Sequence, residues 1–211
     1  MENSVYFIFR FRVIKTDILM YNFFAKSDIM RDFMKEIYIM LTASGTLVAK
    51  SIKFYTRAKY NHVSIGIDSQ MKVFYSFARR VRYLPLIGGF ITEVVDEGLF
   101  KKYCDYECIV YSITVDRKAY NKFRRLLNNY ISNSKKYKYN LLGFFGVMLN
   151  IPFEFKYRRT CAEFVARMLH ESGIYTFNKR FSLVRPEEIS DIPMLKVIFK
   201  GKIKELAELK K

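Results

Sequence analysis

One stretch of the chain predicts local structure more directly than any other, and it reads Arg159-Thr160-Cys161-Ala162-Glu163-Phe164-Val165-Ala166. Thr160 is a good N-cap residue, and Glu163 follows it at the spacing of a capping box. Apolar residues then recur at helical spacing, and Gly173 is placed to end the helix as its C′ residue. The pattern therefore predicts a helix whose first residue is Cys161.

The first position of a helix suits a reactive cysteine. The backbone N–H groups there have no partner within the helix, and the helix dipole favours negative charge. Both effects stabilise a thiolate, which is the nucleophilic form of cysteine. The alternative interpretation of Cys161 is a buried structural cysteine, which is the commoner role of a lone cysteine. A base close to the thiol would favour catalysis.

His62 is the candidate base. It begins the run 62–67, in which apolar and small residues alternate, so we expect a strand with His62 on its small face. A turn is expected at 68–70, followed by a second strand over 73–78 that carries Ser76 on its small face. If the two small faces match, Ser76 lies near His62 and can orient the imidazole; a register shift of one residue would reverse this. A hydrogen-bonded strand histidine without a catalytic role is the alternative.

The second of the two histidines, His170, cannot serve Cys161. It lies nine positions further along the same predicted helix. At ~100° and ~1.5 Å per residue, it is about half a turn out of phase and roughly 13 Å away along the axis. We expect it to interact with the last carbonyls of the helix instead.

A histidine on an early strand, followed by Thr-Cys-x-Glu-Phe-Val-Ala at the start of a late helix, resembles the circularly permuted NlpC-type cysteine peptidases. This papain-like group includes the bacterial YiiX-like proteins. The resemblance runs from about Ile37 to about Glu205, and its weaker parts are Ile37–Thr42, Tyr75–Phe77, Gly88–Phe90 and Tyr137–Gly143. It implies an α+β fold in which the helix that begins at the cysteine packs on an antiparallel sheet. Residues 1–36 would be an ill-defined N-terminal extension, and residues 37–211 the papain-like hydrolase domain.

The resemblance also implies an activity: a cysteine peptidase or amidase that cleaves an amide bond through an acyl-enzyme. Cys161 would be the nucleophile, and His62 would take its proton and pass it to the leaving group. The substrate would be a peptide, a peptidoglycan stem peptide or a lipid-linked amide, and no cofactor or metal is expected. The alternative is an inert, acyltransferase or thioesterase member of the fold that binds an anionic or acylated ligand.

In this family a polar residue on the strand after the histidine strand orients the imidazole, and it is often Glu, His, Gln or Asn. The matching place here falls on Ser76, although serine is a weaker orienting group than a carboxylate. Glu93, just after Gly88-Gly89-Phe90, is the second candidate. The alternative interpretation of Glu93 is a solvated acid in a loop.

Composition sets the remaining limits. The 211 residues, 51% of them hydrophobic, suffice for one domain with a real core. We find no run of about 18 apolar residues and no signal-peptide pattern, so we expect a cytoplasmic protein. Three cysteines fit a reducing compartment, and the spacing of Cys104 and Cys108 lacks the second ligand pair of a zinc site.

The net charge of +17 is compatible with nucleic acid, an anionic membrane or an acidic polymer as partner. No nucleic-acid-binding motif accompanies the charge, so we do not expect a specific nucleic acid as partner. We do expect contact with an anionic surface. A solvated basic surface is the alternative. Arg158-Arg159 and Arg79-Arg80 lie close in sequence to Cys161 and Ser76, so either pair could bring positive charge to the cleft.

Further elements are expected from periodicity and capping residues. Asp116 is the predicted N-cap of an amphipathic helix. The other expected elements are helices over 45–57, 141–149 and from Pro186, and strands over 107–115 and 194–203.

Overall fold

The computed structural model describes residues 33–43, 59–79 and 88–209. The expected helix over 45–57 and most of the expected extension over 1–36 lie outside these ranges, and both stay predictions. The same is true of the side chains of Arg79 and Arg80.

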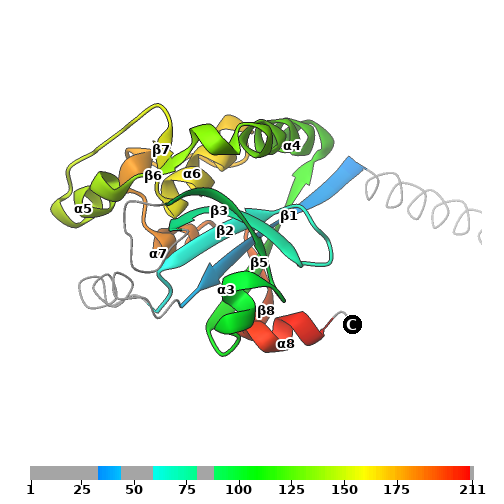
Figure 1. Ribbon diagram of the computed structural model, residues 1–211. Helices are drawn as coiled ribbons and strands as arrows, with labels where there is room; N and C mark the ends of the chain where they lie inside the picture. Colours follow the sequence, from blue (N-terminus) through cyan, green and yellow to red (C-terminus); the bar gives the residue numbers. More distant parts are fainter. Residues whose placement is uncertain (1–32, 44–58, 80–87, 210–211) are drawn as a thin grey trace, which may run out of the picture. The chain divides into compact units, whose positions relative to one another are not determined.

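The described chain is an α+β structure built on one strongly curled sheet of eight strands (Figure 1). The strand order is β7-β6-β4-β3-β2-β1-β5-β8. The pairs β1–β2, β2–β3, β3–β4, β4–β6 and β5–β8 are antiparallel, whereas β6 and β7 are parallel. The strands span Met34–Thr42 (β1), His62–Gly66 (β2), Val73–Arg79 (β3), Gly88–Val94 (β4), Glu107–Asp116 (β5), Lys138–Tyr139 (β6), Arg158–Arg159 (β7) and Lys196–Lys202 (β8).

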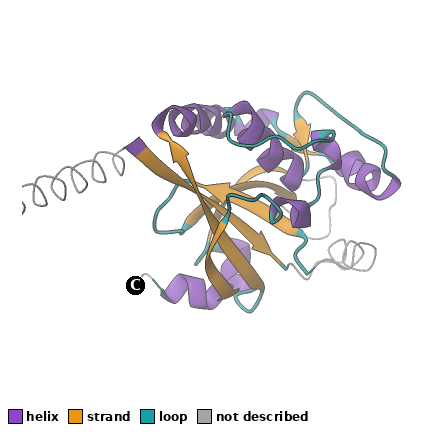
Figure 2. Cartoon of the chain, turned by 180° about the vertical axis from the view of Figure 1, so that it is seen from behind, coloured by secondary structure: helices purple, strands orange, loops and turns teal. Residues whose placement is uncertain are grey.

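Helices cover both faces of this sheet. The helices α4 (Arg117–Ser132) and α6 (Cys161–Glu171) lie on one face, and α3 (Gly98–Lys102) and α8 (Ile203–Glu208) lie on the other (Figures 1 and 2). α5 (Leu141–Leu149) and α7 (Pro186–Ile189) border the start of α6. Short 3₁₀ helices occur at Ser134–Lys136 and Phe181–Leu183.

Because both sheet faces are covered, the central strands are buried on both sides. In β1, Ile37, Ile39 and Leu41 join the core beneath α6 and α4, whereas Tyr38 and Met40 join the core beneath α3 and α8. All five side chains are buried, which explains why β1 reads as a continuous apolar run rather than as an alternating one.

The hairpin that carries His62 forms as the sequence predicts. Asp68 makes the turn, since its carboxylate accepts hydrogen bonds from the backbone N–H groups of Gln70 and Lys72. β2 and β3 then pair with Ile65 opposite Tyr75. This register places Ser76 opposite Ser64, so the small faces of the two strands match.

The predicted caps and later elements also form. Asp116 accepts a hydrogen bond from the N–H of Ala119 and begins α4. The predictions of a helix over 141–149, a short helix from Pro186 and a strand within 194–203 are confirmed by α5, α7 and β8.

Candidate active site

Cys161 is the first residue of α6, as the capping pattern predicts. Thr160 Oγ1 accepts a hydrogen bond from the N–H of Glu163 at 3.2 Å, and the Thr160 carbonyl accepts one from Phe164. The helix ends before Gly173, whose φ of 78° lies in the left-handed region that favours glycine. The cap takes up the N–H of Glu163, which leaves the N–H groups of Cys161 and Ala162 at the helix start.

Buried ion pairs anchor this helix start. Glu163 Oε1 lies 3.3 Å from Arg159 Nε and 3.0 Å from Arg167 Nε, and the Glu163 side chain is fully buried. Burial raises the pKa of Glu163, while the two arginines act in the opposite direction. The Arg159 guanidinium also donates hydrogen bonds to the carbonyls of Phe155, Lys156 and Arg158.

These contacts change the interpretation of the Arg158-Arg159 pair. Arg159 is only 9% exposed, and its guanidinium contacts Glu163 and the preceding loop. Its charge therefore holds in place the chain segment that leads into Cys161. Arg158 is exposed and is the member of the pair whose side chain meets solvent.

His62 joins the cysteine to a carboxylate. Its Nε2 lies 2.8 Å from Glu93 Oε1, and the two side chains are only 14% and 10% exposed. The His62 side chain also hydrogen-bonds the Cys161 thiol. Since Glu93 occupies Nε2, Nδ1 is the ring nitrogen left for the thiol.

The electrostatics of this cluster favour a protonated imidazole. Burial lowers the pKa of His62, but the charge of Glu93 and the hydrogen bonds with Cys161 and Glu93 outweigh it. The net effect raises the pKa of His62 well above its ordinary value. A buried cysteine, imidazole and carboxylate in series can support nucleophilic catalysis.

Ser76 lies on the expected face but does not take the expected partner. Its side chain is fully buried, and within the described ranges its hydroxyl has no hydrogen-bond partner. The imidazole bonds Glu93 instead. The placement of Glu93 in a solvated loop is also wrong, because Glu93 belongs to β4 and its side chain is largely buried.

The curl of the sheet explains this outcome. β4 and β2 are separated by β3 in the strand order, and Glu93 is paired with Phe74. Strand pairing alone therefore gives no contact between Glu93 and His62. Because the sheet is strongly curled, side chains from strands two apart can meet.

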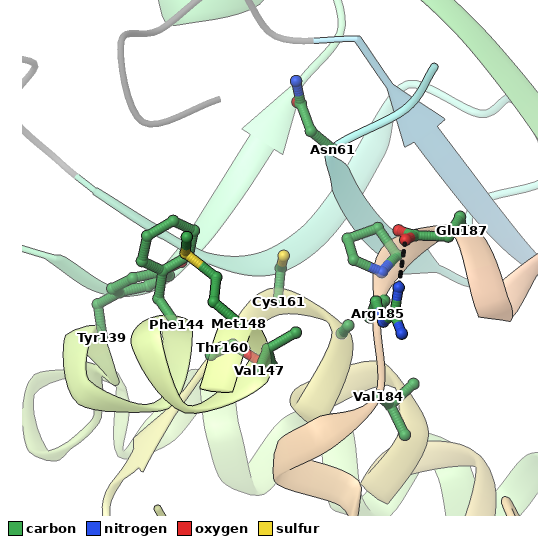
Figure 3. A pocket seen from close by; sticks show the side chains of 12 residues that line it. Asn61, Tyr139, Phe144, Val147, Met148, Thr160, Cys161, Val184, Arg185 and Glu187 are labelled. Atoms are coloured by element: carbon green, nitrogen blue, oxygen red, sulfur yellow. Dashed lines mark ion pairs between the residues drawn. The ribbon is translucent and has the colours of Figure 1, made fainter. Parts of the chain in front are cut away.

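A pocket opens beside the thiol and holds about 500 Å³ of empty space, its open mouth included. Figure 3 shows Cys161 between α5 and the segment 184–187. The Arg185 Nη1–Glu187 Oε1 ion pair, at 3.7 Å, contributes polar atoms to the wall. The other lining residues are mainly apolar: Asn61, Tyr139, Phe144, Val147, Met148, Thr160, Ala162, Val184 and Pro186.

The sequence did not indicate that α5 would form a wall of the site. Its apolar residues predicted a helix, but not the surface on which that helix would lie. The cap gives the local reason for its position: Asn140 Oδ1 accepts from the N–H of Gly143, and Asn140 Nδ2 donates to the Phe153 carbonyl, both at 2.8 Å.

His170 takes no part in the cluster around Cys161. Its Nδ1 lies 2.8 Å from Thr176 Oγ1, and its ring packs on Phe181 with 5.0 Å between centroids. The sequence predicted an interaction with the last helix carbonyls, whereas the hydrogen bond observed is to a side chain. Its location at the far end of α6 agrees with its exclusion as a partner of Cys161.

The remaining cysteines have different surroundings. Cys108 is buried in β5, and burial raises the pKa of its thiol to about 12; Cys104 is partly exposed. Within the parts of the chain that the structure describes, no group of His, Cys, Asp and Glu could hold a metal ion.

No protein-family model matches the sequence, and a search of curated proteins finds no match to it. Over the same described ranges, no helix is both long and apolar enough to cross a membrane.

Proposed function

We propose that this protein is a cysteine hydrolase of the peptidase or amidase type, with Cys161 as nucleophile, His62 as general base and Glu93 as the residue that orients His62. The observation that carries the proposal is that one imidazole, only 14% exposed, interacts with both the Cys161 thiol and the Glu93 carboxylate. The order of histidine strand and cysteine helix supports a permuted, NlpC-type papain-like fold as the finer description of the α+β architecture.

The reaction follows from these positions. His62 holds the thiol proton as an imidazolium, and the Cys161 thiolate attacks the carbonyl carbon of an amide. The tetrahedral intermediate collapses as the protonated His62 gives its proton to the leaving nitrogen, which departs as an amine. Water then attacks the thioester while His62 takes one of its protons. Collapse of the second intermediate releases a carboxylic acid and restores the thiol.

The start of α6 supplies the electrostatic part of the mechanism. The N–H groups of Cys161 and Ala162 precede those taken up by the Thr160 cap, so they are available to an oxyanion formed beside the sulfur. Glu93 keeps the imidazole oriented and stabilises its protonated form. The raised pKa of His62 agrees with this role.

The pocket lining indicates what kind of group lies next to the scissile carbonyl of the substrate. The α5 side chains Phe144, Val147 and Met148 border Cys161 and favour an apolar group next to the scissile carbonyl. Peptides, peptidoglycan stem peptides and lipid-linked amides remain the proposed classes. An acyltransferase or thioesterase would form the same acyl-enzyme and would differ in acceptor or leaving group.

The inert alternative would be favoured if the weakly orienting Ser76 were the partner of the imidazole. Ser76 is not the hydrogen-bond partner of His62, because that partner is Glu93. A largely buried carboxylate hydrogen-bonded to the imidazole is suited to orient an active imidazole.

Acylation by p-nitrophenyl acetate, followed by intact mass and peptide mapping, tests the proposal. We expect one acetyl group on Cys161 in the wild type, none at that position in Cys161→Ala, and a rate lowered by roughly 10²-fold in His62→Ala. His170→Ala is the matched control for histidine removal, and Cys104→Ala for cysteine removal; both should react like the wild type. Acetylation of Cys161 that proceeds equally fast in His62→Ala would overturn the proposal.

A further inference from the structure

α5 presents apolar side chains on the side that faces away from the pocket. Leu142, Phe145 and Leu149 are 54%, 50% and 66% exposed, and their spacing of three and four residues places them on one stripe. Ile151, just after the helix, is 47% exposed. We call these four residues the α5 outer face.

The opposite side of α5 is also apolar, because Phe144, Val147 and Met148 line the pocket at Cys161. Gly146 allows the segment after the helix to pack closely, since a Cβ at this position would clash with the Ile151 carbonyl and the Phe153 ring. A helix that is apolar all round is typical of a protein core or of a membrane environment. α5 lies at the periphery of the fold, where its outer face is exposed (Figure 1).

Exposed basic residues precede and follow α5 in the sequence. Lys138 on β6 pairs in register with Arg158 on β7, and both side chains are exposed, as is that of Lys156. The one acid between residues 134 and 158 is Glu154. Its carboxylate lies 3.8 Å from both Arg167 and Arg180, so these two arginines offset its negative charge.

We propose that the α5 outer face docks on an anionic phospholipid bilayer, with the apolar stripe inserted among the lipids and Lys138, Lys156 and Arg158 at the headgroups. The apolar side chains match the acyl chains of the lipids, and the basic side chains match the anionic headgroups above those chains. The charge complementarity selects anionic lipid as the occupant.

Docking in this way would bring the Cys161 pocket close to the bilayer, because the pocket lining and the α5 outer face lie on opposite sides of the same short helix. The docking proposal does not depend on the proposed hydrolase activity, since binding to vesicles can be measured without catalysis.

Co-sedimentation of the full chain with vesicles tests the docking proposal. We expect binding to mixed phosphatidylcholine–phosphatidylglycerol vesicles and little binding to phosphatidylcholine alone. The triple variant Leu142→Ser, Phe145→Ser, Leu149→Ser should bind roughly tenfold more weakly or worse. Its matched control is Leu99→Ser, Val197→Ser, Leu209→Ser, three apolar residues that are 54%, 50% and 58% exposed elsewhere; it should bind like the wild type.

The charge component needs its own pair of variants. Lys138→Gln, Lys156→Gln, Arg158→Gln should weaken binding more than Lys118→Gln, Lys122→Gln, Arg124→Gln, which removes three exposed charges from α4. Equal losses in the two charge variants would mean that the net charge of +17 binds vesicles without a docking surface, and would overturn the proposal. A concentration-dependent dimer that the α5 triple variant abolishes would also overturn it, because a second copy would then cover the face.

The chain contains no tryptophan, which allows a measurement that does not depend on how well the triple variant folds. Phe145→Trp introduces one fluorophore on the α5 outer face, and Val197→Trp introduces one on β8 as control. We expect anionic vesicles to shift the emission of Phe145→Trp to shorter wavelength and brominated lipid to quench it, with neither effect for Val197→Trp. An unchanged Phe145→Trp spectrum, or equal changes in both variants, would contradict insertion.

Discussion

His62 Nε2 lies 2.8 Å from Glu93 Oε1, and the same ring hydrogen-bonds the Cys161 thiol. A carboxylate at this distance stabilises the protonated ring, which a neutral serine hydroxyl cannot do to the same degree. The pairing therefore supports Glu93, rather than Ser76, as the residue with the proposed orienting role.

Replacing Glu93 with glutamine should slow acylation of Cys161 by roughly 10²-fold. Glutamine keeps the size and the acceptor oxygen of glutamate but removes the charge that stabilises protonated His62. The measurement is the rate of acetyl-enzyme formation with p-nitrophenyl acetate, with circular dichroism as a check that the fold is intact.

Ser76→Ala is the matched control, because it removes the other candidate for the same role. Its buried hydroxyl has no hydrogen-bond partner within the described ranges, so alanine should leave acylation unchanged and the free energy of unfolding equal to that of the wild type or higher. If acylation falls as far in Ser76→Ala as in Glu93→Gln, the assignment of Glu93 is wrong.

The contrast between Cys161 and Glu93 shows which parts of the site could be predicted from sequence. The helix start at Cys161 depends on residues within four positions, so Thr160 and Glu163 were sufficient to predict it. The hairpin from His62 to Ser76 was predictable for the same reason, since its turn and alternation are local.

The contact between His62 and Glu93 crosses an intervening strand and depends on how far the sheet curls. No local pattern in the sequence reports that curl. The position of α5 depends likewise on a long-range contact, between Asn140 and the Phe153 carbonyl. The sequence thus predicted the helix that begins at Cys161, the His62 hairpin and the Cys161–His62 pair. It named Glu93 only as the second candidate for the third residue, and it did not predict the pocket wall.

The protonation of His62 should be visible by NMR, because the chain contains only two histidines. The His62 ring should titrate with a pKa well above about 6.5, and Glu93→Gln should lower that pKa, since it removes the charge that opposes the effect of burial. His170→Asn assigns the two signals. A His62 signal that titrates at the same pH in both proteins would contradict the role of the Glu93 charge.

The raised pKa of His62 also makes a prediction about stability. A pKa raised on folding means that protonation of His62 favours the folded state. This contribution is fully present below about pH 6.5 and is lost as the pH rises toward the folded-state pKa, at about 1.4 kcal/mol per pH unit. Urea unfolding of the wild type and Glu93→Gln across this range should show a smaller loss in the variant.

Asn140→Ala should destabilise the protein by about 1–3 kcal/mol. The side chain is fully buried, and it bonds both the N–H of Gly143 and the carbonyl of Phe153, so its removal leaves one buried and one partly buried group without their partner. Asn133→Ala is the control, because the Asn133 side chain bonds Asn129 at the surface, near the end of α4. Equal free energies of unfolding for the two variants would contradict the importance of this cap.

Arg159→Met should destabilise the protein by about 3–5 kcal/mol, because it leaves the fully buried Glu163 carboxylate with one arginine fewer and removes the donor to three loop carbonyls.

Burial already raises the pKa of Glu163, and the loss of Arg159 should raise it further. The destabilisation should therefore be larger at about pH 8 than at about pH 5, because keeping the Glu163 carboxylate ionised in the folded state costs more in the variant than in the wild type. Arg158→Met, the exposed neighbour, should change the free energy of unfolding by less than about 0.5 kcal/mol at either pH. Urea unfolding of both variants decides the matter: similar losses for the two, or a loss for Arg159→Met that does not grow with pH, would mean that the buried ion pair does not hold the start of the cysteine helix.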